Sequence, residues 1–162
     1  MTDKEAFCEQ ILQNERAMYS LAYSVVKNDA DAAEILSESI LRAYQKKDSL
    51  KSFSSFQAWI LRIVHNTAID YIRKNSAYLP LEMMDVPIED TKEQLLTSLS
   101  LKEAIRSLSQ PYRTVIVLYY FENLSTSQIA SITGVSIVTV RQRLSRARKQ
   151  LREILKEDFR YE

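Results

Sequence analysis

The stretch GVSIVTVRQRLSRARKQLRE, residues 134–153, is rich in hydrogen-bonding side chains and has six basic residues before its first acidic one. Arg141 and Gln142 stand side by side near its start. An arginine fork can pair with guanine and a glutamine amide with adenine in the major groove, while basic groups farther along usually contact phosphates. These residue types indicate a surface that reads duplex DNA. A solvated helix face can have the same composition, so the spacing has to decide.

Apolar residues recur through this stretch at the spacing of a helix. Val140, Leu144, Ala147 and Leu151 follow one another at intervals of four, three and four residues, which predicts one buried stripe. The side chains left on the outer face are Val138, Arg141, Gln142, Ser145, Arg148 and Lys149. A helix built in this way buries its apolar side and presents the polar one to a partner.

A tight turn precedes the basic helix. Ser125 and Gln128 have the spacing of a capping box, which predicts a short helix beginning there. Gly134, the single glycine of the chain, can take the left-handed conformation that ends this helix, and Ser136 can cap the next one. Two helices joined by a short turn with glycine form a helix-turn-helix, so we predict one here.

Composition excludes several classes of function. The 162 residues are 46% hydrophobic and 27% charged, with one glycine and three prolines, which favours a helical globular protein. One cysteine and one histidine supply neither a disulfide framework nor a zinc site, and no phosphate-binding loop or nucleophile motif is present. We therefore expect no enzyme activity, no metal and no cofactor. The polar N-terminus and the lack of a long apolar run predict a cytoplasmic protein without membrane insertion.

Charge and proline divide the chain. Residues 1–77 hold 10 Lys/Arg and 10 Asp/Glu, residues 78–93 hold 1 and 5, and residues 94–162 hold 11 and 6. The middle stretch also contains two of the three prolines, as expected of a flexible linker. We predict an all-α fold of two small helical domains, 1–77 and 94–162, joined by the acidic linker 78–93, with the helix-turn-helix in the second. The positive C-terminal third indicates a polyanionic partner.

Helical periodicity extends through both predicted domains. In the first, we expect helices over about 7–25, 31–45 and 56–75, the second with its inward face at Ala32, Leu36, Ile40 and Ala43. In the second, Ser100 and Glu103 form another capping box, Pro111 suits a first helical turn, and VIVLYYF (115–121) supplies the core.

Together these segments resemble the extracytoplasmic-function group of sigma factors, the promoter-recognition subunits of bacterial RNA polymerase. Residues 124–153 are similar to the group's minus-thirty-five-reading helix-turn-helix. DADAAEILSESILRAYQ (29–45) is similar to the helix that docks on the polymerase clamp, and FQAWILRIVHNTAIDYIRK (56–74) to the minus-ten helix. The most specific part is W-x-x-R-I-x-x-N followed by A-I-D-x-x-R. The resemblance covers nearly the whole chain, in the expected order.

The resemblance implies that one set of residues lies beside the unpaired minus-ten strand, where a base is turned out of the stack. Phe53 can stack on such a base and Asn66 can offer amide hydrogen bonds, although core packing is as good an explanation of Phe53. The set is Lys51, Ser52, Phe53, Ser54, Arg62, His65, Asn66 and Arg73.

Two further sets follow from the resemblance. The minus-thirty-five set is Ile137, Val138, Arg141, Gln142, Arg143, Ser145, Arg146, Arg148 and Lys149. The set that binds core polymerase is Asp31, Glu34, Glu38, Arg42 and Gln45. Because the bulky Val138 stands where the group often has glycine, we expect a distinct minus-thirty-five sequence.

The resemblance also implies partners. We expect a monomer when free, which binds core RNA polymerase at the clamp of its largest subunit and contacts promoter DNA both as duplex and as melted single strand. Control by an anti-sigma factor is implied as well. A stand-alone helix-turn-helix regulator is the alternative; it predicts a stable dimer on palindromic sites, whereas a sigma factor reads asymmetric elements.

Overall fold

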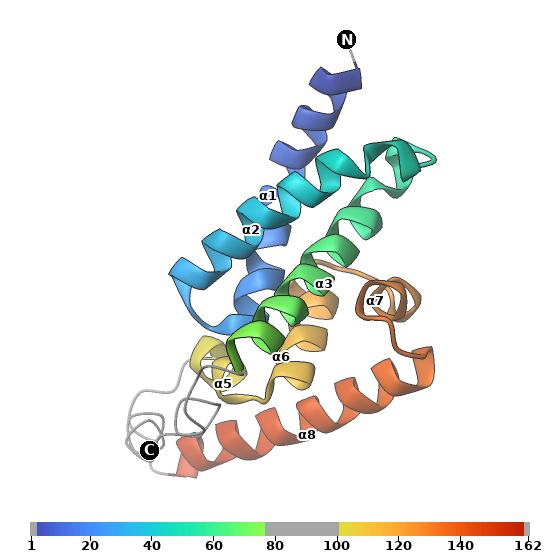
Figure 1. Cartoon of the computed structure of the whole chain (residues 1–162). Helices are drawn as coiled ribbons and strands as arrows, with labels where there is room; N and C mark the ends of the chain where they lie inside the picture. The colour runs from blue at the N-terminus through green and yellow to red at the C-terminus, as the bar shows by residue number, and fades with distance from the viewer. Residues whose placement is uncertain (1–2, 77–100, 161–162) are drawn as a thin grey trace.

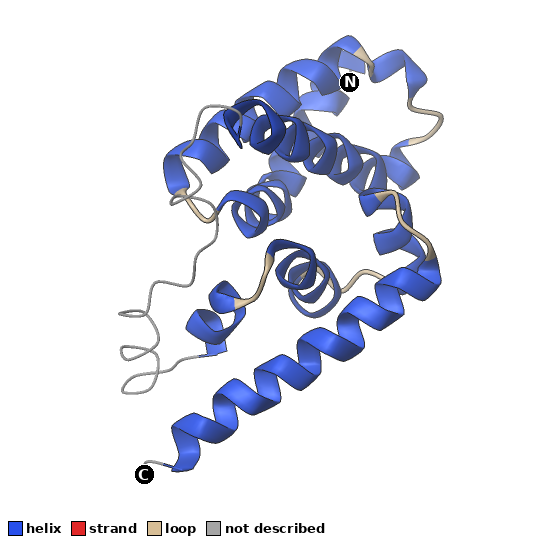
Figure 2. Cartoon of the chain, turned by 60° about the horizontal axis from the view of Figure 1, so that its bottom comes forward, coloured by secondary structure: helices blue, strands red, loops and turns tan. Residues whose placement is uncertain are grey.

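A computed structural model of the protein describes residues 3–76 and 101–160. Every regular element within these two segments is helical, joined by short loops (Figure 2). The prediction of an all-α fold of two helical domains is confirmed. The linker 78–93 and the Ser100 cap lie outside the described residues.

The N-terminal segment is built from three helices that pack side by side (Figure 1): α1 (Asp3–Val26), α2 (Asp29–Gln45) and α3 (Phe56–Ser76). Lys27, at φ 53°, turns the chain between α1 and α2. The Asn28 side chain then caps α2 by accepting a hydrogen bond from the Asp31 amide at 2.9 Å. Helix α2 therefore begins two residues earlier than the periodicity predicts.

The buried face of α2 is rotated from the predicted one. Ala32 and Ala43 are buried as expected, but Ile35 and Ser39 are buried with them. Leu36 and Ile40, both predicted to be inward, are only half-buried. Helix α2 packs against both α1 and α3. Its buried side chains therefore cover the side that faces both neighbours and do not form a single stripe.

The C-terminal segment contains α5 (Leu101–Ser107), α6 (Gln110–Ile116), the π-helical turn η4 (Val117–Phe121), α7 (Thr126–Thr133) and α8 (Ile137–Arg160). Pro111 lies in the first turn of α6, as predicted. Val115, Ile116 and Leu118 are buried, which confirms this run as core, whereas Tyr120 and Phe121 at its end are exposed. Helices α6 and α7 both pack on α8.

The two segments pack against each other through α1 with α6 and α3 with α7 (Figure 1). Arg113 of α6 is only 2% exposed, and its guanidinium donates to the carbonyls of Ser24 and Val25 at the end of α1 and to that of Leu108. The Ser24 and Thr114 hydroxyls are hydrogen-bonded at 3.0 Å. Because a helix leaves its last carbonyls without backbone partners, Arg113 caps α1 from the other segment.

Candidate nucleic-acid interface

The turn before α8 has the predicted chemistry. The Ser125 hydroxyl accepts from the Gln128 amide at 3.1 Å, and the Gln128 side chain accepts from the Ser125 amide at 2.9 Å. Gly134 ends α7 at φ 74°, a conformation that favours glycine, and nothing crowds its missing side chain. The Ser136 hydroxyl accepts from the Thr139 amide at 3.1 Å and so caps α8. Three local caps thus set where α8 starts relative to α7.

Burial along α8 follows the predicted stripe. Val140, Leu144 and Ala147 are buried, and Leu151 is half-buried against the same core. Most of the proposed minus-thirty-five side chains are exposed. The exposed members are Ile137, Val138, Arg141, Gln142, Ser145, Arg146 and Lys149. With Val138 61% exposed, an apolar side chain stands at the start of the helix, where a thymine methyl would be its complement.

Arg143 and Arg148 differ from their neighbours in being half-buried. The Nε of Arg148 donates to the Tyr120 hydroxyl at 2.7 Å, and its guanidinium lies 5.7 Å from the ring centroids of both Tyr119 and Tyr120. Arg143 lies close enough to His65 of α3 for its charge to act on the imidazole. Spacing alone could not predict either contact, because both partners come from other helices.

The loop before α3 carries part of the proposed minus-ten set. Residues Phe53–Ser55 form the short 3-10 helix η2, whose start is capped by the Ser52 hydroxyl accepting from the Ser54 amide at 3.2 Å. Phe53 is 44% exposed, yet its ring centroid lies 6.3 Å from that of the buried Phe56. Both readings of Phe53 therefore have support: one side of the ring packs on the protein, and the rest is open to a base.

Along α3 the proposed residues fall on two sides. Arg62, Asn66 and Arg73 are exposed, whereas His65 is 8% exposed. Its Nδ1 makes no hydrogen bond within the described residues. Burial first of all, and then the positive charge of Arg143, lower the pKa of His65 to about 4, while a hydrogen bond with Asn66 acts the other way. His65 is therefore not accessible to a DNA strand in this arrangement of the two segments.

The proposed polymerase-binding face of α2 is an ion-pair surface shared with α3. Arg42 contacts Glu38 at 3.2 Å on its own helix and Asp70 at 3.0 Å on α3, and these bonds, that to Asp70 foremost, raise its pKa. The bond between Arg42 and Asp70 joins two helices, so spacing within one helix could not predict it. The Tyr71 hydroxyl donates to Asp31 at 2.7 Å, and this hydrogen bond raises the pKa of Tyr71 to about 12.

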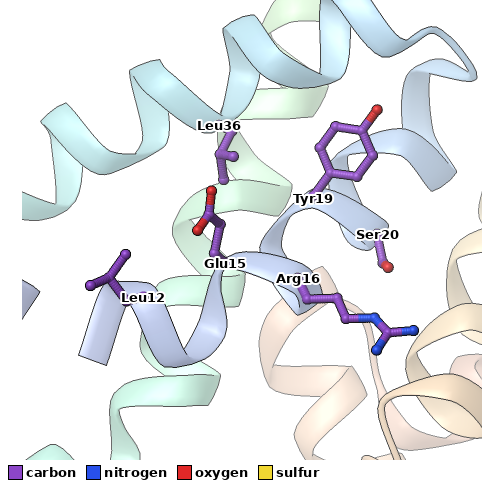
Figure 3. A pocket seen from close by; sticks show the side chains of 6 residues that line it. All are labelled: Leu12, Glu15, Arg16, Tyr19, Ser20 and Leu36. Carbon is purple, nitrogen blue, oxygen red and sulfur yellow. The ribbon is translucent and has the colours of Figure 1, made fainter. Parts of the chain in front are cut away.

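A groove of about 520 Å³ lies along this ion-pair surface, between α2 and α3. Leu41, which is exposed, and Lys74 line it together with the proposed Glu34, Glu38 and Arg42. Sequence reasoning missed Leu41, although its place outside the apolar stripe of α2 was a signal of exposure. A second groove, of about 500 Å³, lies between α1 and α2 (Figure 3), and none of the proposed residues lines it.

Over residues 3–76 and 101–160, no three His, Cys, Asp or Glu side chains come together in a way that could hold a metal ion. None of the helices in these segments is both long and apolar enough to cross a membrane.

Two family patterns match the chain. "Sigma-70 region 2" matches residues 11–78 and "Sigma-70, region 4" matches residues 98–151. The first holds the proposed minus-ten and polymerase-binding sets. The second holds the helix-turn-helix.

Two curated relatives match over more than nine-tenths of their length. RNA polymerase sigma factor SigV of Bacillus subtilis is 34% identical over 98% of this chain and 96% of its own. ECF RNA polymerase sigma factor SigW of the same organism is 32% identical over 96% of this chain and 91% of its own.

Solved structures are also similar. The sigma factor RpoE, in complex with the anti-sigma factor NepR from Bartonella quintana, has a TM-score of 0.74 and 25% identity, covering 94% of this chain and 98% of that one. CnrH, in complex with the cytosolic domain of CnrY, has a TM-score of 0.69 and 22% identity over 96% and 91%, a likeness of fold.

Proposed function

Because this chain belongs to the extracytoplasmic-function group of sigma-70 factors, which direct transcription initiation and are not enzymes, we propose how its surfaces divide that work. The face of α2 with Asp31, Glu34, Glu38, Arg42 and Gln45 binds the clamp of the largest polymerase subunit. The loop 51–54 with Arg62, Asn66 and Arg73 of α3 contacts the melted minus-ten strand. Helix α8 reads the minus-thirty-five duplex. No cofactor takes part.

The observation that carries this proposal is the joint presence of two exposed surfaces on the two matched segments. One is the outer face of α8, and the other is the loop with the polar side of α3. A stand-alone regulator would need only the first. The second, with its exposed Phe53 and Asn66, suits an unstacked base.

On a promoter the two segments separate. Here α3 packs against α7, whereas elements 25 base pairs apart lie roughly 85 Å apart along B-DNA. Residues 77–100 join the segments, and a stretch of that length spans at most roughly 86 Å when fully extended. The reach is therefore just sufficient once the contacts of α1 with α6 and of α3 with α7 are released. Tethering then makes the second DNA contact intramolecular.

We also propose an anti-sigma partner and a cytoplasmic location for a chain that is monomeric when free. The similar RpoE structure is a complex with an anti-sigma factor, and this chain covers nearly all of that protein. An anti-sigma factor that binds the packed form would keep the two DNA surfaces too close together to span a promoter.

Arg141→Ala is expected to weaken holoenzyme binding at one minus-thirty-five position by about 1–3 kcal/mol, because an exposed arginine fork discriminates one base pair. Affinity should be measured on promoter fragments that carry every single substitution in the element. Lys149→Ala is the matched control. Lys149 lies farther along the helix, so its loss should weaken binding to all fragments alike. Uniform loss for Arg141→Ala would show that α8 is placed wrongly on the duplex.

A further inference from the structure

The end of α6 has an unusual backbone next to the recognition helix. Residues Val117–Phe121 form the π-helical turn η4, which contains the adjacent tyrosines 119 and 120. Their ring centroids are 4.9 Å apart in an edge-to-face arrangement. Single π-helical turns inside helices are rare and often occur at functional sites. Tyr120 is 50% exposed, so core packing does not account for it.

Both tyrosines face one arginine of α8. The Arg148 guanidinium carbon lies 5.7 Å from each ring centroid, and Nε donates to the Tyr120 hydroxyl at 2.7 Å. An arginine has five N–H donors, four of them on the two terminal nitrogens. Within the described residues those terminal nitrogens make no hydrogen bond, so the guanidinium of Arg148 is held through Nε and its four terminal N–H donors are unused.

The helix register gives the side of α8 on which Arg148 lies. Arg148 comes seven residues after Arg141, which is close to two full turns, so both lie on the same side of α8. Ser145, between them on that side, is exposed. Basic side chains in the later turns of a recognition helix usually contact the phosphate backbone. An arginine fork with free terminal nitrogens is the group that binds phosphate oxygens in pairs.

We propose that Tyr120 is a positioning residue for promoter binding: its hydroxyl and ring orient Arg148 to bind one backbone phosphate of the minus-thirty-five duplex. This inference depends on the proposed role of α8. Ordering a long side chain at the moment of binding costs affinity, and an arginine that is ordered beforehand avoids that cost. The ring faces also attract the guanidinium by a cation–π contact.

Tyr120→Phe separates the hydroxyl from the ring. Affinity of the holoenzyme for a promoter fragment, chosen by mapping start sites with the unmodified protein, should be measured over a series of salt concentrations. We expect Tyr120→Phe to weaken binding about three- to tenfold. Arg148→Ala should weaken it at least as much and reduce the slope of log affinity against log salt by about 0.9, the effect of one lost phosphate contact. Adding Tyr120→Phe to Arg148→Ala should change nothing further.

Tyr112→Phe makes the same chemical change on α6 and should leave both affinity and slope unaltered. The proposal is overturned if Tyr120→Phe binds like the unmodified protein, or if it weakens binding equally with and without Arg148. If Arg141→Ala and Arg148→Ala both leave affinity and slope unchanged, the proposed binding of α8 to DNA is wrong, and so is the proposed role of Tyr120. Thermal unfolding of each variant shows whether a loss comes from instability, which would not change the salt slope.

Discussion

Phe56→Ala is expected to lower the free energy of unfolding by about 3–5 kcal/mol, the largest effect we foresee for a single substitution. Phe56 is 1% exposed at the start of α3. Its ring centroid lies 5.9 Å from that of Phe7 on α1, 5.5 Å from that of Trp59 and 6.3 Å from that of Phe53. Removing the ring leaves a cavity in the middle of this aromatic cluster.

Chemical denaturation of the full chain measures the effect, with Phe56→Leu as the matched variant. Leucine keeps most of the volume, so its cost should stay below about 1.5 kcal/mol. Similar small losses for both variants would contradict the packing described for α1 and α3. The ring of Phe53 packs against that of Phe56. We therefore expect holoenzyme with Phe56→Ala to melt the minus-ten region less well than the unmodified holoenzyme, even at temperatures where the variant is fully folded.

The stability of the chain should fall as the pH is lowered from 6.5 to about 4, by up to about 3 kcal/mol from His65 alone. An unfolded histidine takes up a proton near pH 6.5, whereas burial and the charge of Arg143 keep His65 neutral in the folded state down to about pH 4. Between these values the unfolded chain binds more protons. The contribution is therefore fully present above pH 6.5 and is lost on acidification.

His65→Leu removes this titration by replacing the imidazole with an apolar side chain of similar size. The free energy of unfolding of both proteins should be measured from pH 7.5 to 4. As the pH falls, we expect the free energy of unfolding of the unmodified protein to decrease more than that of the leucine variant. Parallel curves would show that His65 is not buried in the folded chain.

Local features of the fold could be predicted from the sequence because their physics is local. The capping box at Ser125, the left-handed Gly134 and the stripe of α8 depend only on residues within a few positions of one another, and all were confirmed. The face of α2 was only half right, since two neighbouring helices share its buried side.

What the sequence did not reveal are contacts between distant residues. Arginine is usually exposed, so nothing in the sequence marks Arg113 as a buried cap for α1. The same holds for His65 against Arg143 and for Arg148 against Tyr120. In each case the two partners lie on different elements. The packing of the two segments brings Arg113 and His65 to their partners, whereas Arg148 and Tyr120 meet within the C-terminal segment. The roles proposed for the three residue sets remain predictions.

We propose that this chain starts transcription by holding polymerase on two promoter elements at once. The most direct measurement adds the purified chain to core RNA polymerase with genomic DNA fragments and maps the 5′ ends of the transcripts. We predict new start sites that share two asymmetric elements, and their loss when the minus-thirty-five element of a fragment is replaced. Stable binding to polymerase without any new start site would contradict the account.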